Sequence, residues 1–325
     1  MFKWKKLGKV FSPGPQHGRE WLNEFAQAPA TLLFDDFVRV YFSCRPKADA
    51  KGQYVSYSAF LDLDRRDLFK VVNVSANPIL PLGPLGAFDE FGIYPVSVAR
   101  DGADVRAYYA GWTRCESVPF NVAIGGAISH DNGNTFAKLG LGPVIGYSPN
   151  EPFVMSGPKI RRFNDRWYLW YIAGRKWKVV DGRAEPVYKI RMATSDDGVT
   201  WHKEDRDLIE SRIEEDEAQA SPDVFFAKRQ VPHVLLLPVQ RWLPRQDLRL
   251  PHRLCLQPRL AALDARRRQG RHRHLRDGLG FGNDQLPARL RGGRADLHGL
   301  PGQPGRPRGL RARSARRKAG VRTWQ

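Results

Sequence analysis

Short runs of aromatic and β-branched residues recur along the first two thirds of the chain, each of them after a proline. The prolines follow one another at intervals of 66, 63 and 64 residues: Pro29, Pro95, Pro158 and Pro222. The runs after the first three are residues 38–42, 105–109 and 167–171. Their composition favours strand over helix. Asp-Asp, Asp-Gly or Asn-Asp pairs just before the runs are typical of tight hairpin turns. A fixed period with several antiparallel strands predicts a repeating all-β fold.

A second motif recurs with the same period. Residues 127–136 reappear as 193–201, which places the aromatic residues Phe136 and Trp201 65 positions apart. The motif resembles the Asp-box hairpin of β-propellers, in which Ser, Asp and Thr tie a turn together and the aromatic residue packs between blades. We expect a structural role for it. Because 325 residues hold about five such periods, the predicted fold class is an all-β, five-bladed β-propeller.

The charge of the chain is divided very unevenly. The whole chain has 53 Lys and Arg against 34 Asp and Glu, a formal charge of +19. Residues 231–325 hold 22 of the basic residues against five Asp and no Glu, which leaves the first 230 residues nearly neutral at +2. At face value the basic part indicates a disordered nucleic-acid-binding arm. The alternative is a change of reading frame.

Codon degeneracy favours the change of frame. Residues 227–237 can be back-translated with permitted codons and read again in a frame shifted by one base. The result is AKGKYHMFFCY, an aromatic strand like the earlier ones. The same frame then permits YGYRIGYASSRDLLHWTRDD, which parallels residues 188–205, and it places a Tyr-Pro pair at Pro287, 65 residues after Pro222. We infer a single-base slip near Lys228. Residues 1–228 would then hold blades one to three and the start of blade four, and 229–325 an out-of-frame tail rich in Arg, Pro, Gly and Leu, disordered or misfolded.

Composition also limits the compartment and the cofactors. Cys44, Cys115 and Cys255 lack metal-ligand spacing, and the histidines form no ligand cluster. No apolar run approaches the roughly 20 residues of a membrane helix, and the first residues lack a secretory signal. We therefore expect a cytoplasmic protein with no metal, no cofactor and no membrane contact.

Residues 20–228 resemble the five-bladed propeller glycosidases, the broad group of arabinanases, xylosidases, invertase-like enzymes and β-mannoside phosphorylases. The resemblance is greatest to an uncharacterised bacterial branch. It rests on these segments: AQAP at 26–29, YFSCR at 41–45, FDEFG at 88–92, YYAGW at 108–112, EPF at 151–153 and WYIAGRKW at 170–177. The chain departs from the pattern at Phe25, where His is expected, and after Lys228.

Acidic residues precede the innermost strand of several blades. Glu24, Glu90 and Glu217 each lie five residues before a repeat proline, and Glu151 lies seven before the third. In a propeller these starting loops open on one face, so the acids should converge on one pocket. Glycoside hydrolysis needs one protonated and one ionised carboxyl group. We predict catalytic roles for Glu90, Asp89, Glu151 and Glu217, with loop capping as the alternative for Glu90. Glu24 is a weaker candidate, because the resemblance implies no acid there.

Basic and aromatic residues are the candidates for substrate binding. Arg45, Arg114 and Lys176 end the second strand of successive blades, where they could bind sugar hydroxyls, a carboxylate or a phosphate. Surface salt bridges are the alternative. Tyr94 is placed with them, and Trp112 could stack on a pyranose face or pack between blades.

The sequence thus predicts a glycoside hydrolase-like protein that acts on an oligosaccharide or glycoconjugate by carboxylate acid/base catalysis, inactive or poorly soluble as written. A glycoside phosphorylase and a non-catalytic carbohydrate-binding propeller remain open as alternatives. A nucleic-acid-binding protein would require the basic tail to be genuine. The expected partner is therefore a carbohydrate and no nucleic acid.

Overall fold

The structure, a computed structural model, describes Lys5 and residues 7–212, 214–227, 231–237 and 259–262. These residues lie within one compact unit, Met1–Gln269. The elements are η1 (Pro15–His17), β1 (Glu24–Leu33), β2 (Phe37–Arg45), β3 (Tyr57–Asp64), β4 (Val71–Val74), β5 (Gly92–Asp101), β6 (Asp104–Arg114), β7 (Phe120–Ser129), β8 (Ala137–Lys138), β9 (Phe153–Phe163), β10 (Arg166–Val180), β11 (Arg183–Ser195), β12 (His202–Lys203), β13 (Ala220–Ala227), β14 (Val231–Leu237) and β15 (Arg259–Ala262). Within the described part, no helix is long and apolar enough to cross a membrane.

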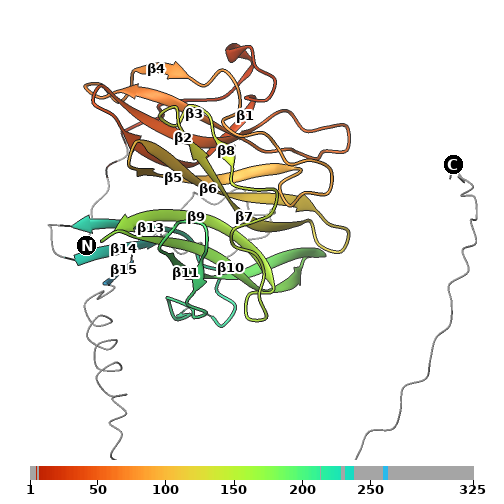
Figure 1. Ribbon diagram of the computed structural model, residues 1–325. Coiled ribbons are helices and arrows are strands. Elements are labelled where there is room, and N and C mark those ends of the chain that lie inside the picture. The colour runs from red at the N-terminus through yellow and green to blue at the C-terminus, as the bar shows by residue number, and fades with distance from the viewer. Residues whose placement is uncertain (1–4, 6, 213, 228–230, 238–258, 263–325) are drawn as a thin grey trace, which may run out of the picture. The chain divides into compact units, whose positions relative to one another are not determined.

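The strands form four antiparallel sheets that follow one another in chain order (Figure 1). The first sheet is β1–β4, the second β5–β8, the third β9–β12 and the fourth β13–β15. Strand β5 packs against the first sheet, β9 against the second, and β13 against the third. The all-β class and the repetition of antiparallel sheets are therefore confirmed. The number of blades and the closure of a ring remain predictions. Of the predicted tail, 229–325, the structure describes the backbone of β14 and β15, and the rest lies outside the described residues.

The predicted hairpins lie where the sequence placed them. The pairs at 35–36, 101–102 and 164–165 connect the first two strands of the first three sheets. Both Asn164 and Asp165 have positive φ, at 50° and 60°, as the favoured two-residue hairpin turn requires. The aromatic runs fall inside β2, β6 and β10. Their buried side chains form three apolar clusters: one joins the first two sheets, one the second and third, and one the third and β13.

Each repeat proline lies inside the first strand of its sheet, at a bulge. The pairing register shifts at this point in β1, β5, β9 and β13. Ala28, Gly157 and Ser221, which precede three of the prolines, have φ between 51° and 60°. Proline lacks an N–H for the ladder and is tolerated within strands mainly at bulges. The repeated proline therefore marks a repeated bulge in the backbone. The bulge changes the direction of the residues that precede it in each of these strands.

The Asp-box turns join neighbouring sheets. The Tyr41 hydroxyl of the first sheet donates to the Gly133 carbonyl of the second over 2.9 Å. The Tyr108 hydroxyl of the second sheet donates to the Gly198 carbonyl of the third over 2.6 Å. We call each of these bonds a latch. Both tyrosines are buried, so each latch fixes a turn of the following sheet against the sheet before it.

The aromatic residues of the Asp boxes pack as expected. Phe136 lies 6.0 Å from the Tyr41 ring, and Trp201 lies 5.3 Å from Tyr108. Trp170 of the third sheet stands in the aligned position of Tyr41 and Tyr108. It is 3% exposed, and its Nε1 has no hydrogen-bond partner among the described residues. The Trp201 Nε1 also has no hydrogen-bond partner among the described residues. The equivalent residue of the second sheet, Phe136, has no N–H group, so the repeat predicts no hydrogen bond at this position.

Candidate functional site

Within each sheet, the predicted site residues lie at the end where the first strand begins and the second strand ends. Because β1 and β2 run antiparallel, the start of β1 at Glu24 lies opposite the end of β2 at Arg45. The same holds for Gly92 of β5, opposite Trp112 of β6. We call this end, made of the starts of β1, β5, β9 and β13 and the ends of β2, β6, β10 and β14, the loop edge. All predicted acids lie at the starts of strands or in the loops just before them, and all predicted cations lie at or near the strand ends.

Asp89 is buried in an ion pair within its own sheet. The residue is 1% exposed, and its Oδ2 lies 2.6 Å from the Lys138 Nζ of β8. The same oxygen accepts a hydrogen bond from the Tyr109 hydroxyl over 3.0 Å. Burial and the neighbouring Asp89 carboxylate raise the pKa of Tyr109, so this tyrosine stays a donor. These contacts tie the loop before β5 to the far strand of its sheet.

Glu151 repeats this arrangement in the third sheet. It is fully buried, and its Oε2 lies 2.6 Å from the Lys203 Nζ of β12. The Tyr171 hydroxyl and Arg191 Nη1 contact Oε1 at 2.8 and 3.1 Å. Burial, with the Glu151 charge, raises the pKa of Tyr171. Two of the four predicted catalytic carboxylates are thus each held by a tyrosine and a lysine from their own sheet.

The other acids accept hydrogen bonds from backbone N–H groups or from a hydroxyl. Glu90 is partly exposed, and its Oε2 accepts a hydrogen bond from the Gly86 N–H over 3.0 Å, so it does cap its loop. Glu217 is 8% exposed, and its Oε2 accepts from the Arg212 N–H over 2.9 Å. Glu24 is partly exposed and accepts from the Tyr54 hydroxyl over 2.9 Å. Glu90 and Glu24 therefore combine a defined orientation with access to solvent.

Two of the three predicted binding cations have acidic partners. Arg114 lies 4.0 Å from Asp49 and donates to the Tyr54 carbonyl over 3.0 Å. Lys176 lies 2.6 Å from Asp216, and this hydrogen bond raises the pKa of the lysine. The predicted alternative of surface salt bridges thus describes their contacts.

Arg45 lies among aromatic rings. Its Cζ is 5.1 Å from the centre of the Phe25 ring, 5.3 Å from Tyr54 and 5.8 Å from Tyr94. Burial raises the pKa of Tyr94, an effect that the Arg45 charge opposes. Tyr94 and Arg45 are thus neighbours, and their role in substrate binding stays a prediction.

Trp112 packs inside the second sheet. Its ring is 6.2 Å from that of Phe91, and its indole fills the space above Gly92, where any Cβ would collide with it. It also joins the apolar cluster around Val122 and Val154. Packing, the alternative role weighed for this residue, is therefore what its contacts show.

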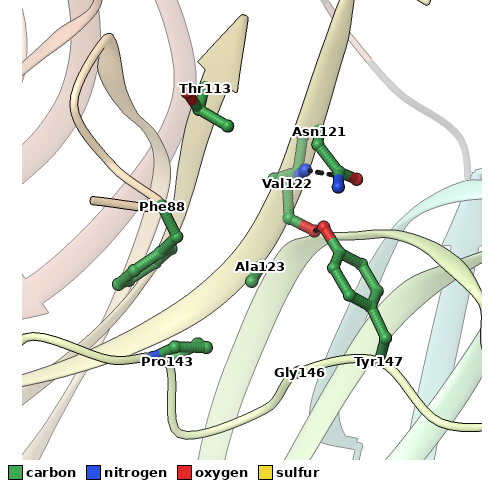
Figure 2. Close-up of a pocket in the computed structure, with 8 residues that line it drawn as sticks. All are labelled: Phe88, Thr113, Asn121, Val122, Ala123, Pro143, Gly146 and Tyr147. Carbon is green, nitrogen blue, oxygen red and sulfur yellow. Dashed lines mark hydrogen bonds between the residues drawn. The ribbon is translucent and has the colours of Figure 1, made fainter. Parts of the chain in front are cut away.

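A pocket of about 270 Å³ opens beside the end of β6 (Figure 2). Its lining residues are Phe88, Thr113, Asn121, Val122, Ala123, Pro143, Gly146 and Tyr147. The Tyr147 hydroxyl donates to the Val122 carbonyl over 3.0 Å, and burial raises the pKa of this tyrosine to about 12. None of these residues was a sequence candidate. Phe88 and Thr113 are next to predicted positions. The loop that holds Pro143 and Tyr147 contains none of the repeated motifs, so the sequence pattern could not predict its part in the pocket.

Sequence reasoning also missed the basic partners of the buried acids. Lys138 and Lys203 each lie two residues after the Asp-box aromatic, which is a repeat signal that could have found them. Arg191 contacts Asp205 and Asp207 at 3.0 and 2.9 Å as well as Glu151. Among the residues with a described placement, no group of three or more His, Cys, Asp or Glu is arranged to hold a metal ion.

Comparisons with known proteins extend over most of the chain. No family model matches the sequence. The uncharacterized protein Rv1502 of Mycobacterium tuberculosis strain ATCC 25618 / H37Rv is 32% identical over 222 residues, which cover 68% of this chain and 71% of the relative. The uncharacterized protein MT1551 of strain CDC 1551 / Oshkosh matches to the same extent.

Several solved structures resemble this one. A protein described as a glycoside hydrolase aligns with a TM-score of 0.56 and 17% identity, over 76% of this chain and 78% of its own. The alpha-L-arabinofuranosidase from Lactobacillus brevis aligns with a TM-score of 0.46 at 17% identity, over 67% and 66%. The Bombyx mori GH32 beta-fructofuranosidase BmSUC1 aligns with a TM-score of 0.47 and 17% identity, and the match covers 65% of this chain and only 40% of that one. At 17% identity, the likeness to the first of these is one of fold.

Proposed function

This protein belongs to the same family as the uncharacterized protein Rv1502 of Mycobacterium tuberculosis, and we propose its function from the residues of the candidate site. We propose that it is a glycoside hydrolase-like protein that acts on an oligosaccharide or glycoconjugate. The observation that carries the proposal is the acid at the loop edge of each sheet, beside cations and aromatic rings. The fold shared with a solved glycoside hydrolase also supports it, although fold alone does not assign chemistry.

The contacts at the loop edge divide the acids into two roles. Asp89 and Glu151 are paired with lysines and buried, which suits positioning of the loops before β5 and β9. Glu90 is accessible and oriented by one backbone N–H, as an acid/base that exchanges its proton with solvent must be. We assign the role of proton donor to Glu90 and that of the ionised carboxylate to Glu217. Their reaction is glycosidic cleavage by acid/base catalysis.

A screen of chromogenic aryl glycosides tests this assignment. We expect sugar release by the protein whose reading frame is restored after Lys228, as proposed below, and loss of most of it when Glu90→Gln is made in that protein. Glu116→Gln, an exposed acid in the loop after β6, serves as the matched control and should keep full activity. Equal activity of Glu90→Gln and Glu116→Gln would rule out Glu90 as the acid/base. Release of sugar phosphate that requires added phosphate would assign phosphorolysis instead.

A non-catalytic carbohydrate-binding protein is the second candidate. One observation favours it: Asp89 and Glu151 are already engaged in buried ion pairs, which leaves fewer carboxylates for chemistry. Sugar binding without turnover, weakened by Glu90→Gln, is the result expected of this alternative.

We also propose that a single-base slip near Lys228 replaced blades four and five. The match to Rv1502 leaves about a third of this chain unmatched, which is close to the length of residues 229–325. The unpartnered Nε1 of Trp170 is a second support, because Tyr41 and Tyr108 at this position each bond the Asp box of the next sheet. The nucleotide sequence around codon 228 tests the proposal, and codons incompatible with the shifted frame would refute it. The glycoside screen should therefore include the frame-restored protein.

A further inference from the structure

Arg45 differs from the other cations at the loop edge in its lack of an acidic partner. Arg114 lies near Asp49, and Lys176 pairs with Asp216. For Arg45 the structure shows one hydrogen bond, from its Nε to the Ser56 hydroxyl over 3.1 Å, and no ion pair to any described residue. Its Nη1 and Nη2 are bonded to no described residue. The guanidinium group therefore keeps the two N–H-bearing nitrogens that recognise oxyanions in a bidentate manner.

The acid nearest to Arg45 in register is engaged elsewhere. Glu24 is the cross-strand partner of Arg45 in the β1–β2 pair. Its carboxylate instead accepts the hydrogen bond of Tyr54, which raises the pKa of that tyrosine. Glu24 thus contributes negative charge to the neighbourhood, but no contact of ion-pair length to the guanidinium group is present in the described structure.

The surroundings of Arg45 hold its guanidinium group in place. Rings of Phe25, Tyr54 and Tyr94 lie around it at 5.1–5.8 Å, and Ser56 fixes its Nε. An arginine on aromatic faces is stabilised by cation–π attraction and loses little further side-chain freedom when it binds a ligand. Phe25 is 41% exposed, so the same place also offers an exposed aromatic residue. Aromatic rings are suited to contact with the apolar face of a sugar.

We propose that Arg45 receives an oxyanion carried by the sugar substrate, with Phe25 beneath the sugar ring. The substrate class is then an anionic saccharide, with a carboxylate or a phosphate group as the shared chemistry. This inference rests on the proposed function for the sugar part of the ligand. It makes Arg45 a specificity-determining residue at the edge of the site that Glu90 serves.

Calorimetric titration of the full chain with four probes tests the proposal: D-glucuronate, D-glucose 6-phosphate, D-glucose and inorganic phosphate. We expect at least one anionic sugar to bind at least about tenfold more tightly than glucose, because a charge-assisted bond contributes about 1.5–3 kcal/mol. Binding of glucuronate alone identifies the oxyanion as a carboxylate, and binding of the phosphate ester alone identifies it as a phosphate. Inorganic phosphate that binds as tightly as either sugar would overturn the role of the sugar ring.

Two variants separate recognition from a merely structural role. Arg45→Gln should weaken binding of the anionic sugar about tenfold and leave glucose binding unchanged. Arg100→Gln is the matched control, because Arg100 also lies over a ring, that of Phe34 at 4.5 Å, and also makes one hydrogen bond, to the Leu33 carbonyl. It should bind as the wild type does. Equal affinity of Arg45→Gln and wild type, or equal binding of glucose and glucuronate by the wild type, would overturn the proposal.

The two proposals fail in different ways. If the anion inference is wrong while the glycosidase proposal is right, neutral glycosides are cleaved and Arg45→Gln cleaves them equally well. If the glycosidase proposal is wrong, no glycoside is cleaved, and the preference of the wild type for the anionic sugar can still be measured.

Discussion

Removal of the Tyr108 hydroxyl should lower the melting temperature by an amount set by its latch to the third sheet. Tyr108 is 1% exposed, and its hydroxyl donates to the Gly198 carbonyl over 2.6 Å. Phenylalanine keeps the ring and its packing, so the cost is the lost hydrogen bond and the weakened pairing of a buried carbonyl, about 2 kcal/mol. For a folded unit of about 150–250 residues, each kcal/mol corresponds to roughly 2–4 °C, so Tyr108→Phe should melt about 4–8 °C lower.

The repeat supplies both a replicate and a control for this measurement. Tyr41→Phe breaks the equivalent latch to Gly133 and should show a similar loss. Tyr168→Phe is the control, because the Tyr168 hydroxyl makes no hydrogen bond to a described residue. The assay is thermal unfolding followed by circular dichroism. Melting temperatures of Tyr108→Phe and Tyr41→Phe that equal that of Tyr168→Phe would refute the claim that these hydroxyls hold the sheets together.

Two further predictions concern the charged groups. Lys138→Met leaves Asp89 buried without its cation and should cost about 3–5 kcal/mol in urea denaturation. Lys176→Met breaks an exposed pair and should have a much smaller effect. Equal costs would contradict the positioning role of Asp89. Partial burial by itself would raise the pKa of Asp131. Hydrogen bonds from Ser129 and Thr135 outweigh this effect and lower that pKa to about 2. The stability that this carboxylate contributes is therefore complete above the ordinary Asp pKa near 4 and is lost as the pH falls towards 2. Asp131→Asn should lower the melting temperature at pH 7 and reduce its decline between about pH 4 and 2, and an unchanged decline would refute this account.

Much of the fold follows from local sequence. The turn at Asn164 and Asp165 needs positive φ, which asparagine and aspartate tolerate, and the aromatic runs beside such turns suit half-buried strands. The Asp-box turns are also local, since Ser129, Asp131 and Thr135 bond one another within a few residues. Period and turn chemistry therefore sufficed to predict strands, hairpins and sheet order.

The contacts of the site residues could not be predicted in this way. Glu90 and Asp89 are adjacent in sequence, yet one is partly exposed and the other is paired with Lys138, 49 positions away. Whether an acid is open or paired depends on which side chain the far strand of the sheet brings to it. The rings around Arg45 come from β1, from the loop before β3 and from β5, and no period in the sequence links these three places.

The latches also bear on the order in which the chain can become stable during synthesis. Tyr41 bonds Gly133, which is made 92 residues later, and Tyr108 bonds Gly198, which is made 90 residues later. A sheet whose tyrosine forms a latch therefore gains that hydrogen bond only after the next sheet has been synthesised. Such non-local contacts form slowly. A nascent chain exposes one unfinished apolar interface at each stage, at its most recent sheet. Chaperone dependence should therefore move along the chain with translation instead of ending when a single sheet is complete.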